Sequence, residues 1–119
     1  MRIAVPTNGK KGKDETVAEH FGKCETFTVF DEKGEFVEVI ENTSEHMGGQ
    51  GLPPELLKKN KIDVLVCQGL GPNAIQMCAG FGIQVYLAQA EKAQNMIKLW
   101  KEKRARKASM DDGCKDHQH

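Results

Sequence analysis

Most of the side chains that could bind a metal fall into a few short segments of this chain. His20 and Cys24 lie four residues apart, and His46 precedes the glycine-rich stretch 48–51. Imidazole nitrogen and cysteine sulfur are ligands that soft and borderline metals prefer. The spacing of His20 and Cys24 is nevertheless common in chains that bind no metal, and residues 42–51 could be a plain connection to a helix.

The end of the chain holds another possible ligand group. Cys114, His117 and His119 form a Cys-x2-His-x-His pattern beside several aspartates. Short tracts rich in cysteine and histidine can bind zinc or iron, with a further ligand from elsewhere. A polar, disordered terminus would have the same composition, so both interpretations stay open.

A glycine-rich turn offers a different kind of chemistry. The apolar run Val64–Cys67 is typical of a buried parallel strand, and Gly69, Gly71 and Asn73 follow it directly. Pro72 suits the first position of a helix. Such a turn places free N–H groups at the carboxyl end of a strand, where open α/β sheets bind ligands and where anions are favoured.

Composition excludes several classes of function. The chain of 119 residues has 17 basic and 17 acidic side chains, so it has no net charge that would favour nucleic acid or an anionic membrane. There is no signal peptide pattern or membrane-length apolar run, which predicts a cytoplasmic protein. The cysteines are therefore expected to be thiols, with Cys67 and Cys78 in the core.

The pattern of apolar residues predicts an α/β domain. Strands are expected at 2–6, 26–30, 36–40, 62–67 and 83–87, and helices at 53–61, 72–79 and 90–107. Residues 10–19 are expected to form a solvated loop. Right-handed crossovers then give a three-layer domain over 1–107. Its mixed sheet would have five strands in the order 3-2-1-4-5, with strand two antiparallel to the others. This is the arrangement of ribonuclease H-like folds. Residues 108–119 would be a flexible tail.

This topology makes two further predictions. Strands one and four are parallel, so Asn8, His20, His46 and the Gly69–Asn73 turn are expected to face one cleft. The strand at 36–40 would lie at the edge of the sheet, where it could pair with a second copy, so we expect a monomer or a weak homodimer.

Several motifs together resemble a known family. They are Ile3-Ala4-Val5-Pro6, His20-Phe21-Gly22, Phe27-Thr28-Val29-Phe30, Gly48-Gly49-Gln50-Gly51, and Asp63-Val64-Leu65-Val66 with Gly69-Leu70-Gly71-Pro72-Asn73-Ala74. In their order and spacing they are similar to the dinitrogenase iron-molybdenum cofactor biosynthesis family, also described as nitrogenase accessory factor-like. The resemblance covers about residues 1–100. Gln50 interrupts the glycine run, and the Cys/His tail is not a feature of the family at large.

The resemblance implies a ribonuclease H-like fold and a carrier rather than an enzyme. Its cargo would be an iron-molybdenum-type cofactor, its precursor or another metal-sulfur cluster, and its partners would be cluster-assembly or recipient proteins. His20 is the best ligand candidate. The cofactor-binding candidates are His20, Phe21, Gly22, Cys24, His46, Gly69, Gly71 and Asn73. The candidate metal ligands are His20, Cys114, His117 and His119.

Two other functions are alternatives to a carrier: a nuclease and a sensor of a small molecule. A nuclease with a ribonuclease H-like fold needs several carboxylates on its central strands. Residues 2–6 have none, and the strand at 62–67 has only Asp63 at its start, which disfavours this function. The other alternative is a phosphate or small-molecule sensor that uses the Gly69–Asn73 turn, although the chain has no Walker or Gly-x-Gly-x-x-Gly pattern.

Overall fold

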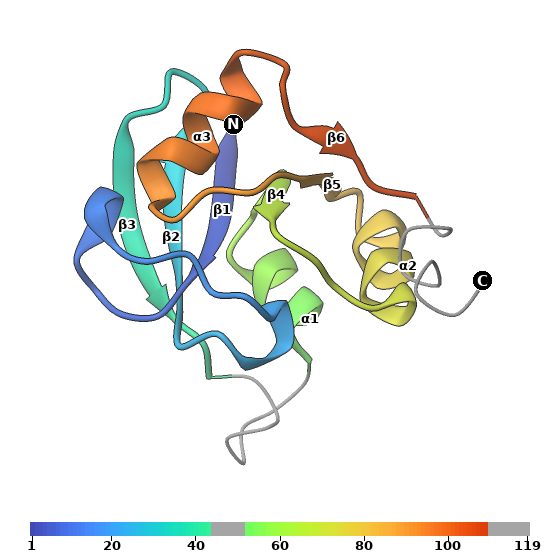
Figure 1. The fold of residues 1–119 in the computed structure, drawn as a ribbon. Helices are drawn as coiled ribbons and strands as arrows, with labels where there is room; N and C mark the ends of the chain where they lie inside the picture. Colours follow the sequence, from blue (N-terminus) through green and yellow to red (C-terminus); the bar gives the residue numbers. More distant parts are fainter. Residues whose placement is uncertain (44–51, 110–119) are drawn as a thin grey trace.

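Two apolar strands form the centre of the sheet in a computed structural model of the chain, which describes residues 1–43 and 52–109. These are β1 (Arg2–Thr7) and β4 (Val64–Cys67), which pair in parallel (Figure 1). Residues 3–7 of β1 and all of β4 are buried. A strand that is covered on both faces in this way needs apolar side chains at successive positions, as the sequence has.

The sheet has six strands in the order β3-β2-β1-β4-β5-β6. Strands β2 (Thr26–Asp31) and β3 (Phe36–Glu41) form an antiparallel hairpin beside β1, while β5 (Gln84–Leu87) is parallel to β4. The predicted order 3-2-1-4-5 and the antiparallel second strand are confirmed. The predicted number of five strands is wrong, because β6 (Arg106–Lys107) pairs with β5. The ribonuclease H-like assignment stays a prediction.

The sixth strand arises because the last helix is shorter than predicted. Helix α3 covers Ala93–Lys101 rather than 90–107. Lys103 has a φ of 61°, a left-handed conformation that ends helices. The apolar stripe stops at Trp100, so the basic residues beyond it gain nothing from a helical arrangement against the sheet. The chain instead runs beside β5, and the Ala108 amide donates to the Val85 carbonyl at 2.8 Å.

Helices cover both faces of the sheet, which gives the expected three layers (Figure 1). Helices α1 (Pro53–Lys59) and α2 (Pro72–Gly80) pack on one face, where Leu57 and Cys78 join Leu65 in the core. Helix α3 packs on the other face, and its Met96 and Ile97 belong to a second apolar cluster.

The predicted solvated loop at residues 10–19 is wrong for part of this segment. Residues 10, 11, 13, 14, 16 and 19 are exposed, whereas residues 12, 15, 17 and 18 are buried. After the short 3-10 helix η1 (Gly12–Asp14), Val17 and Ala18 are buried. The Val17 amide donates to the Glu91 carbonyl at 2.8 Å, and the Ala18 amide donates to the Pro6 carbonyl at 2.9 Å. Two buried apolar residues at the end of a polar stretch thus help to hold it on the core.

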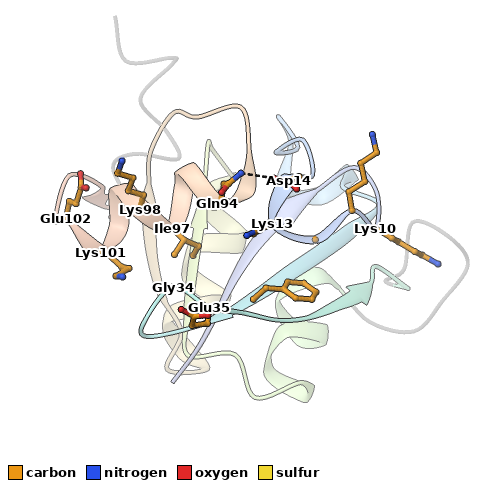
Figure 2. Close-up of a pocket in the computed structure, with 13 residues that line it drawn as sticks. Lys10, Lys13, Asp14, Gly34, Glu35, Gln94, Ile97, Lys98, Lys101 and Glu102 are labelled. Carbon is orange, nitrogen blue, oxygen red and sulfur yellow. Dashed lines mark hydrogen bonds between the residues drawn. The ribbon is translucent and has the colours of Figure 1, made fainter.

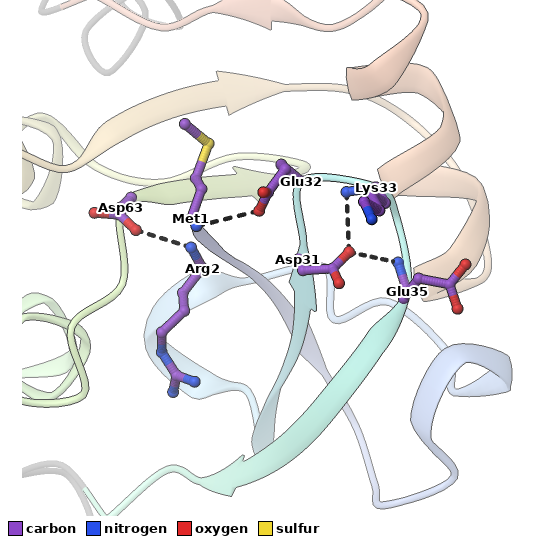
Figure 3. A network of polar contacts seen from close by, with 7 residues as sticks. All are labelled: Met1, Arg2, Asp31, Glu32, Lys33, Glu35 and Asp63. Atoms are coloured by element: carbon purple, nitrogen blue, oxygen red, sulfur yellow. Dashed lines mark hydrogen bonds and ion pairs between the residues drawn. The ribbon is translucent and has the colours of Figure 1, made fainter.

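Polar contacts close the amino-terminal edge of the sheet (Figure 3). The terminal ammonium group pairs with Glu32 at 3.1 Å, and the Arg2 amide donates to the Asp63 carboxylate at 2.8 Å. The Asp31 carboxylate accepts hydrogen bonds from the amides of Lys33 and Glu35. Within residues 1–43 and 52–109, no helix is long and apolar enough to cross a membrane.

Candidate functional site

The candidate residues His20–Cys24 and Gly69–Asn73 lie at the carboxyl edge of the central strands. Ile3 pairs with Val64 in parallel register, so the segments that follow β1 and β4 leave from the same edge. The chain from Ala18 to Glu25 folds back onto this edge, where the Glu25 amide donates to the Thr7 carbonyl at 3.1 Å. The open carboxyl edge is the usual ligand-binding edge of such sheets.

His20 is presented to solvent by a short 3-10 helix, η2 (Phe21–Lys23). Its side chain is 73% exposed, and the nearest carboxylate is Glu19 at 3.9 Å. The next residue, Phe21, is buried and packs against Phe27 with 5.7 Å between ring centroids. Phe21 therefore anchors the segment in the core, and the same anchor leaves His20 free to bind an external ligand.

Three glycines at this edge face open space. A Cβ atom added to Gly22, Gly69 or Gly71 would meet no other atom within 4 Å, and none of the three has a positive φ. Gly12, Gly34 and Gly82, in contrast, all have positive φ values that favour glycine. The fold itself therefore does not require glycine at Gly22, Gly69 and Gly71. The open space at these three positions would let a bound molecule approach the backbone closely.

The turn after β4 also offers backbone donors. Gly71 is the N-cap of α2 and supplies no side-chain cap, so the first N–H groups of the helix have no capping side chain. Asn73 is exposed in the first turn. An anion placed against this turn would meet both the N–H groups and the positive end of the helix dipole.

A cavity of about 410 Å³ opens at the same edge beside the end of β3. It carries two cations from different segments, Lys10 and Lys23, together with Glu25 and Glu41. Lys10 is paired with Glu41, whereas Lys23 forms no ion pair with the described residues. Lys23 directly follows Gly22, so it adds positive charge to the edge where the open glycines lie.

The cysteines of the described residues are core side chains. Cys24, Cys67 and Cys78 are buried in one apolar cluster, which confirms the prediction for Cys67 and Cys78. Burial raises the pKa of each thiol to about 12. Metals bind the thiolate, so such a thiol is a poor ligand at neutral pH. Cys24 is further held by Asn42, whose side-chain amide donates to the Cys24 carbonyl at 2.8 Å.

No group of three His, Cys, Asp or Glu side chains in the described part of the chain could hold a metal ion. His46, Cys114, His117 and His119 lie outside the described residues, so their roles stay predictions. The single cleft predicted for Asn8, His20, His46 and the Gly69–Asn73 turn also stays a prediction, although Asn8 is exposed as such a site requires.

Sequence reasoning did not find a groove of about 880 Å³ that the structure shows beside α3. Its walls carry lysines from 10–13 and from 98–101, which are separated by most of the chain. The two basic runs are visible in the sequence. Their juxtaposition is not, because it depends on how the segment after β1 packs against α3.

Comparison with known proteins assigns the chain to a family. A family model described as dinitrogenase iron-molybdenum cofactor matches residues 1–103. The chain belongs to this family. This confirms the resemblance seen in the sequence and associates the chain with the handling of iron-molybdenum cofactor. One relative is an uncharacterized protein of Methanocaldococcus jannaschii, which is 34% identical in an alignment of 107 positions that covers 86% of each chain.

Solved structures agree with the family assignment. A candidate NifB protein from Thermotoga, of the DUF35 family, has a TM-score of 0.74 and 28% identity, covering 89% of this chain and 91% of that chain. The apo form of the orange protein from Desulfovibrio gigas has a TM-score of 0.77 and 25% identity, covering 91% and 92%.

Proposed function

We propose that the chain binds and carries an iron-molybdenum-type cofactor or another metal-sulfur cluster during cluster assembly, without catalysing a reaction. The observation that carries this proposal is the open edge formed by Gly22, Gly69 and Gly71, with the exposed imidazole of His20 beside one of these glycines. The edge has room for a bulky group and a side chain that can ligate a metal. Family membership gives the class of cargo.

The charges and donors of the edge fit an anionic cargo. The uncapped start of α2 and the Lys23 side chain both favour negative charge. A single exposed imidazole would hold a cluster at one metal atom and leave the rest accessible. This arrangement suits a carrier, because the cargo has to pass to another protein. His46 would add a second ligand from outside the described residues.

The same uncapped helix start supports a second candidate function. The N–H groups of Asn73 and Ala74, which follow Pro72 and have no capping side chain, also suit a phosphate group. The chain would then be a sensor of a phosphate-bearing molecule, and His20 would have no part in binding. The two functions make different predictions for His20.

The test is reconstitution without oxygen. The purified chain is incubated with ferrous iron, molybdate and sulfide under a reductant, desalted, and assayed for bound metal and for sulfur-to-metal absorption. We expect metal to be retained and the affinity to fall by about tenfold or more in His20→Ala and Gly69→Ala, since direct ligands and close contacts are lost. Gly80→Ala is the control, because it adds a methyl group in equally open space at the end of α2.

Thermal melts should show that each variant is folded, because an added Cβ meets no atom at Gly69 or Gly80 and the His20 side chain is exposed. Loss of metal only in a chain that ends at Met110 would move the site to Cys114, His117 and His119 and contradict the proposal. Retention of inorganic phosphate with no metal in any form would favour the sensor. Equal metal binding by His20→Ala and the unaltered chain would also contradict the carrier site described here.

A further inference from the structure

A groove runs between α3 and the segment that follows β1. One wall is formed by residues 10–14 around η1, the other by the outer side of α3, and the turn between β2 and β3 closes one end (Figure 2). The Gln94 side chain donates to the Asp14 carboxylate at 2.7 Å and ties the two walls together. At about 880 Å³ and open to solvent, the groove is large enough for several residues of an extended peptide.

Positive charge lines both walls. Lys10, Lys11 and Lys13 come from one wall, and Lys98 and Lys101 come from the other. Lys13 extends from η1 toward α3 (Figure 2). Within residues 1–43 and 52–109, the side-chain ammonium groups of Lys13 and Lys98 form no ion pair. The helix dipole accounts for cations in the last turn of α3, but not for those of residues 10–13.

Carboxylates are interleaved with these lysines. Asp14, Glu35 and Glu102 also line the groove, and Glu102 lies 3.4 Å from Arg104. A uniform polyanion such as nucleic acid would be repelled at these positions, whereas a peptide can place its carboxylates opposite lysines alone. The mixed charge pattern therefore favours a protein segment as the occupant.

The groove also has an apolar surface. Phe36 is 47% exposed although it belongs to β3, and its ring lies against Gly12. Gly12 has a φ of 72°, which lets the η1 wall pass over the ring. Ile97 of α3 lies behind the opposite wall but is 2% exposed, so Phe36 supplies the accessible apolar surface. An exposed aromatic ring flanked by cations can contact one apolar side chain between acidic residues.

We propose that this lysine groove is the docking site for an acidic segment of a partner protein, with carboxylates that pair with Lys13 and Lys98 and an apolar side chain that packs on Phe36. Lys10 lines both this groove and the cavity at the carboxyl edge of the sheet. A segment that occupies the groove would therefore bring its protein next to His20–Cys24. The partner would be a protein that donates or receives the cargo, and this part of the proposal rests on the proposed carrier function.

Fluorescence anisotropy tests the groove without any cargo. The probe is a labelled synthetic peptide in which glutamates flank a central phenylalanine. We expect it to bind, and we expect Lys13→Glu with Lys98→Glu to weaken binding by about tenfold or more, since two attractive pairs become repulsive. The matched control is Lys58→Glu with Lys59→Glu, an equal change of charge on exposed residues of α1 on the other face of the sheet.

Four results would overturn the proposal: no binding, equal weakening by the control pair, equal binding of a peptide with glutamine in place of glutamate, or preference for single-stranded DNA. A peptide with serine in place of phenylalanine should bind more weakly to the unaltered chain, and equal affinity would contradict the role of Phe36. Metal uptake by the Lys13→Glu, Lys98→Glu variant should be unchanged. Failure of the docking site is thus distinct from failure of the carrier function.

Discussion

Glu15 shows how one buried carboxylate organises the segment between β1 and η2. The residue is buried, and its side chain accepts hydrogen bonds from the Lys11 amide at 3.1 Å and the Thr16 amide at 2.9 Å. A Cβ atom on Gly9 would collide with the Glu15 carboxylate, so a larger residue there would have to displace this side chain. The Glu15 carboxylate thus accepts hydrogen bonds that backbone carbonyls would otherwise accept, and it fixes residues 11–16, which include one wall of the lysine groove.

The charge of Glu15 should make this segment sensitive to pH. Its hydrogen bond from the Thr16 amide lowers the pKa of Glu15 below 4.5, so the charged form is favoured in the folded state. The charged Glu15 side chain stabilises the folded chain fully at pH values above the pKa that it has in the unfolded chain. This stabilisation is lost as the pH falls through the lower pKa that it has in the folded chain. We expect Glu15→Gln to lower the free energy of unfolding by about 1.5–3 kcal/mol at pH 7, the contribution of hydrogen bonds to a charged group.

Urea denaturation at pH 7 and in acid measures the effect, with Glu19→Gln as the control because Glu19 is exposed in the same segment. The difference between the Glu15→Gln chain and the unaltered chain should shrink in acid. A difference that is independent of pH would show that the charge of Glu15 has no part in stability.

Helix α3 and strand β6 show that a basic run can end a helix rather than extend it. The last turn of α3 is closed by hydrogen bonds from the Lys103 amide to the Trp100 carbonyl at 3.0 Å and from the Arg104 amide to the Leu99 carbonyl at 2.8 Å. Lys103 itself adopts the left-handed conformation that ends the helix. The residues beyond it are then free to form β6.

This arrangement predicts opposite effects for two glycine substitutions. Lys103→Gly should raise the free energy of unfolding by about 0.5–1 kcal/mol, because glycine adopts a positive φ without strain. Lys98→Gly should lower it by a similar amount, because Lys98 lies within α3 and glycine is a poor helix former. Chemical denaturation measures both. If α3 continued through Lys103, both variants would be destabilised.

The whole molecule has two sheet edges that differ in protection. At one edge, β3 exposes Phe36 and Val37. Two acidic side chains of β3 form ion pairs, Glu38 with Arg2 of β1 and Glu41 with Lys10 in the segment after β1. At the other edge, β6 covers β5, and Ala108 packs against the core beyond it. The predicted monomer or weak homodimer stays a prediction, and β3 is the edge that could form such a dimer.

Removal of β6 should therefore expose a strand edge. A chain that ends at Ala105 should be less stable than one that ends at Ser109, since it loses the pairing of β5 with Arg106–Lys107 and the Ala108 contacts. It should also associate at higher concentration through the uncovered β5 edge. Urea denaturation and size-exclusion chromatography compare the two chains. Equal stability and equal elution would show that β6 contributes nothing to the domain.

The amino-acid sequence by itself determined the features that depend on local pattern. The apolar run of β4, the glycine turn after it and the Pro72 start of α2 are all encoded by neighbouring residues, and the strand order follows from them through the handedness of crossovers. The motifs around His20 and Gly69–Asn73 identified the family for the same reason, since they are short and contiguous.

Only the tertiary structure decided the features that depend on contacts between distant residues. Val17 packs in the apolar cluster of α3 and its amide bonds to the Glu91 carbonyl, and the walls of the lysine groove are joined by the bond between Asp14 and Gln94. Cys24, which the sequence offered as a ligand, is a core thiol because it packs in one cluster with Cys67 and Cys78. β6 forms because Arg106–Lys107 meet β5. None of these pairings leaves a periodic signal in the chain, because each joins segments whose spacing is set by the fold.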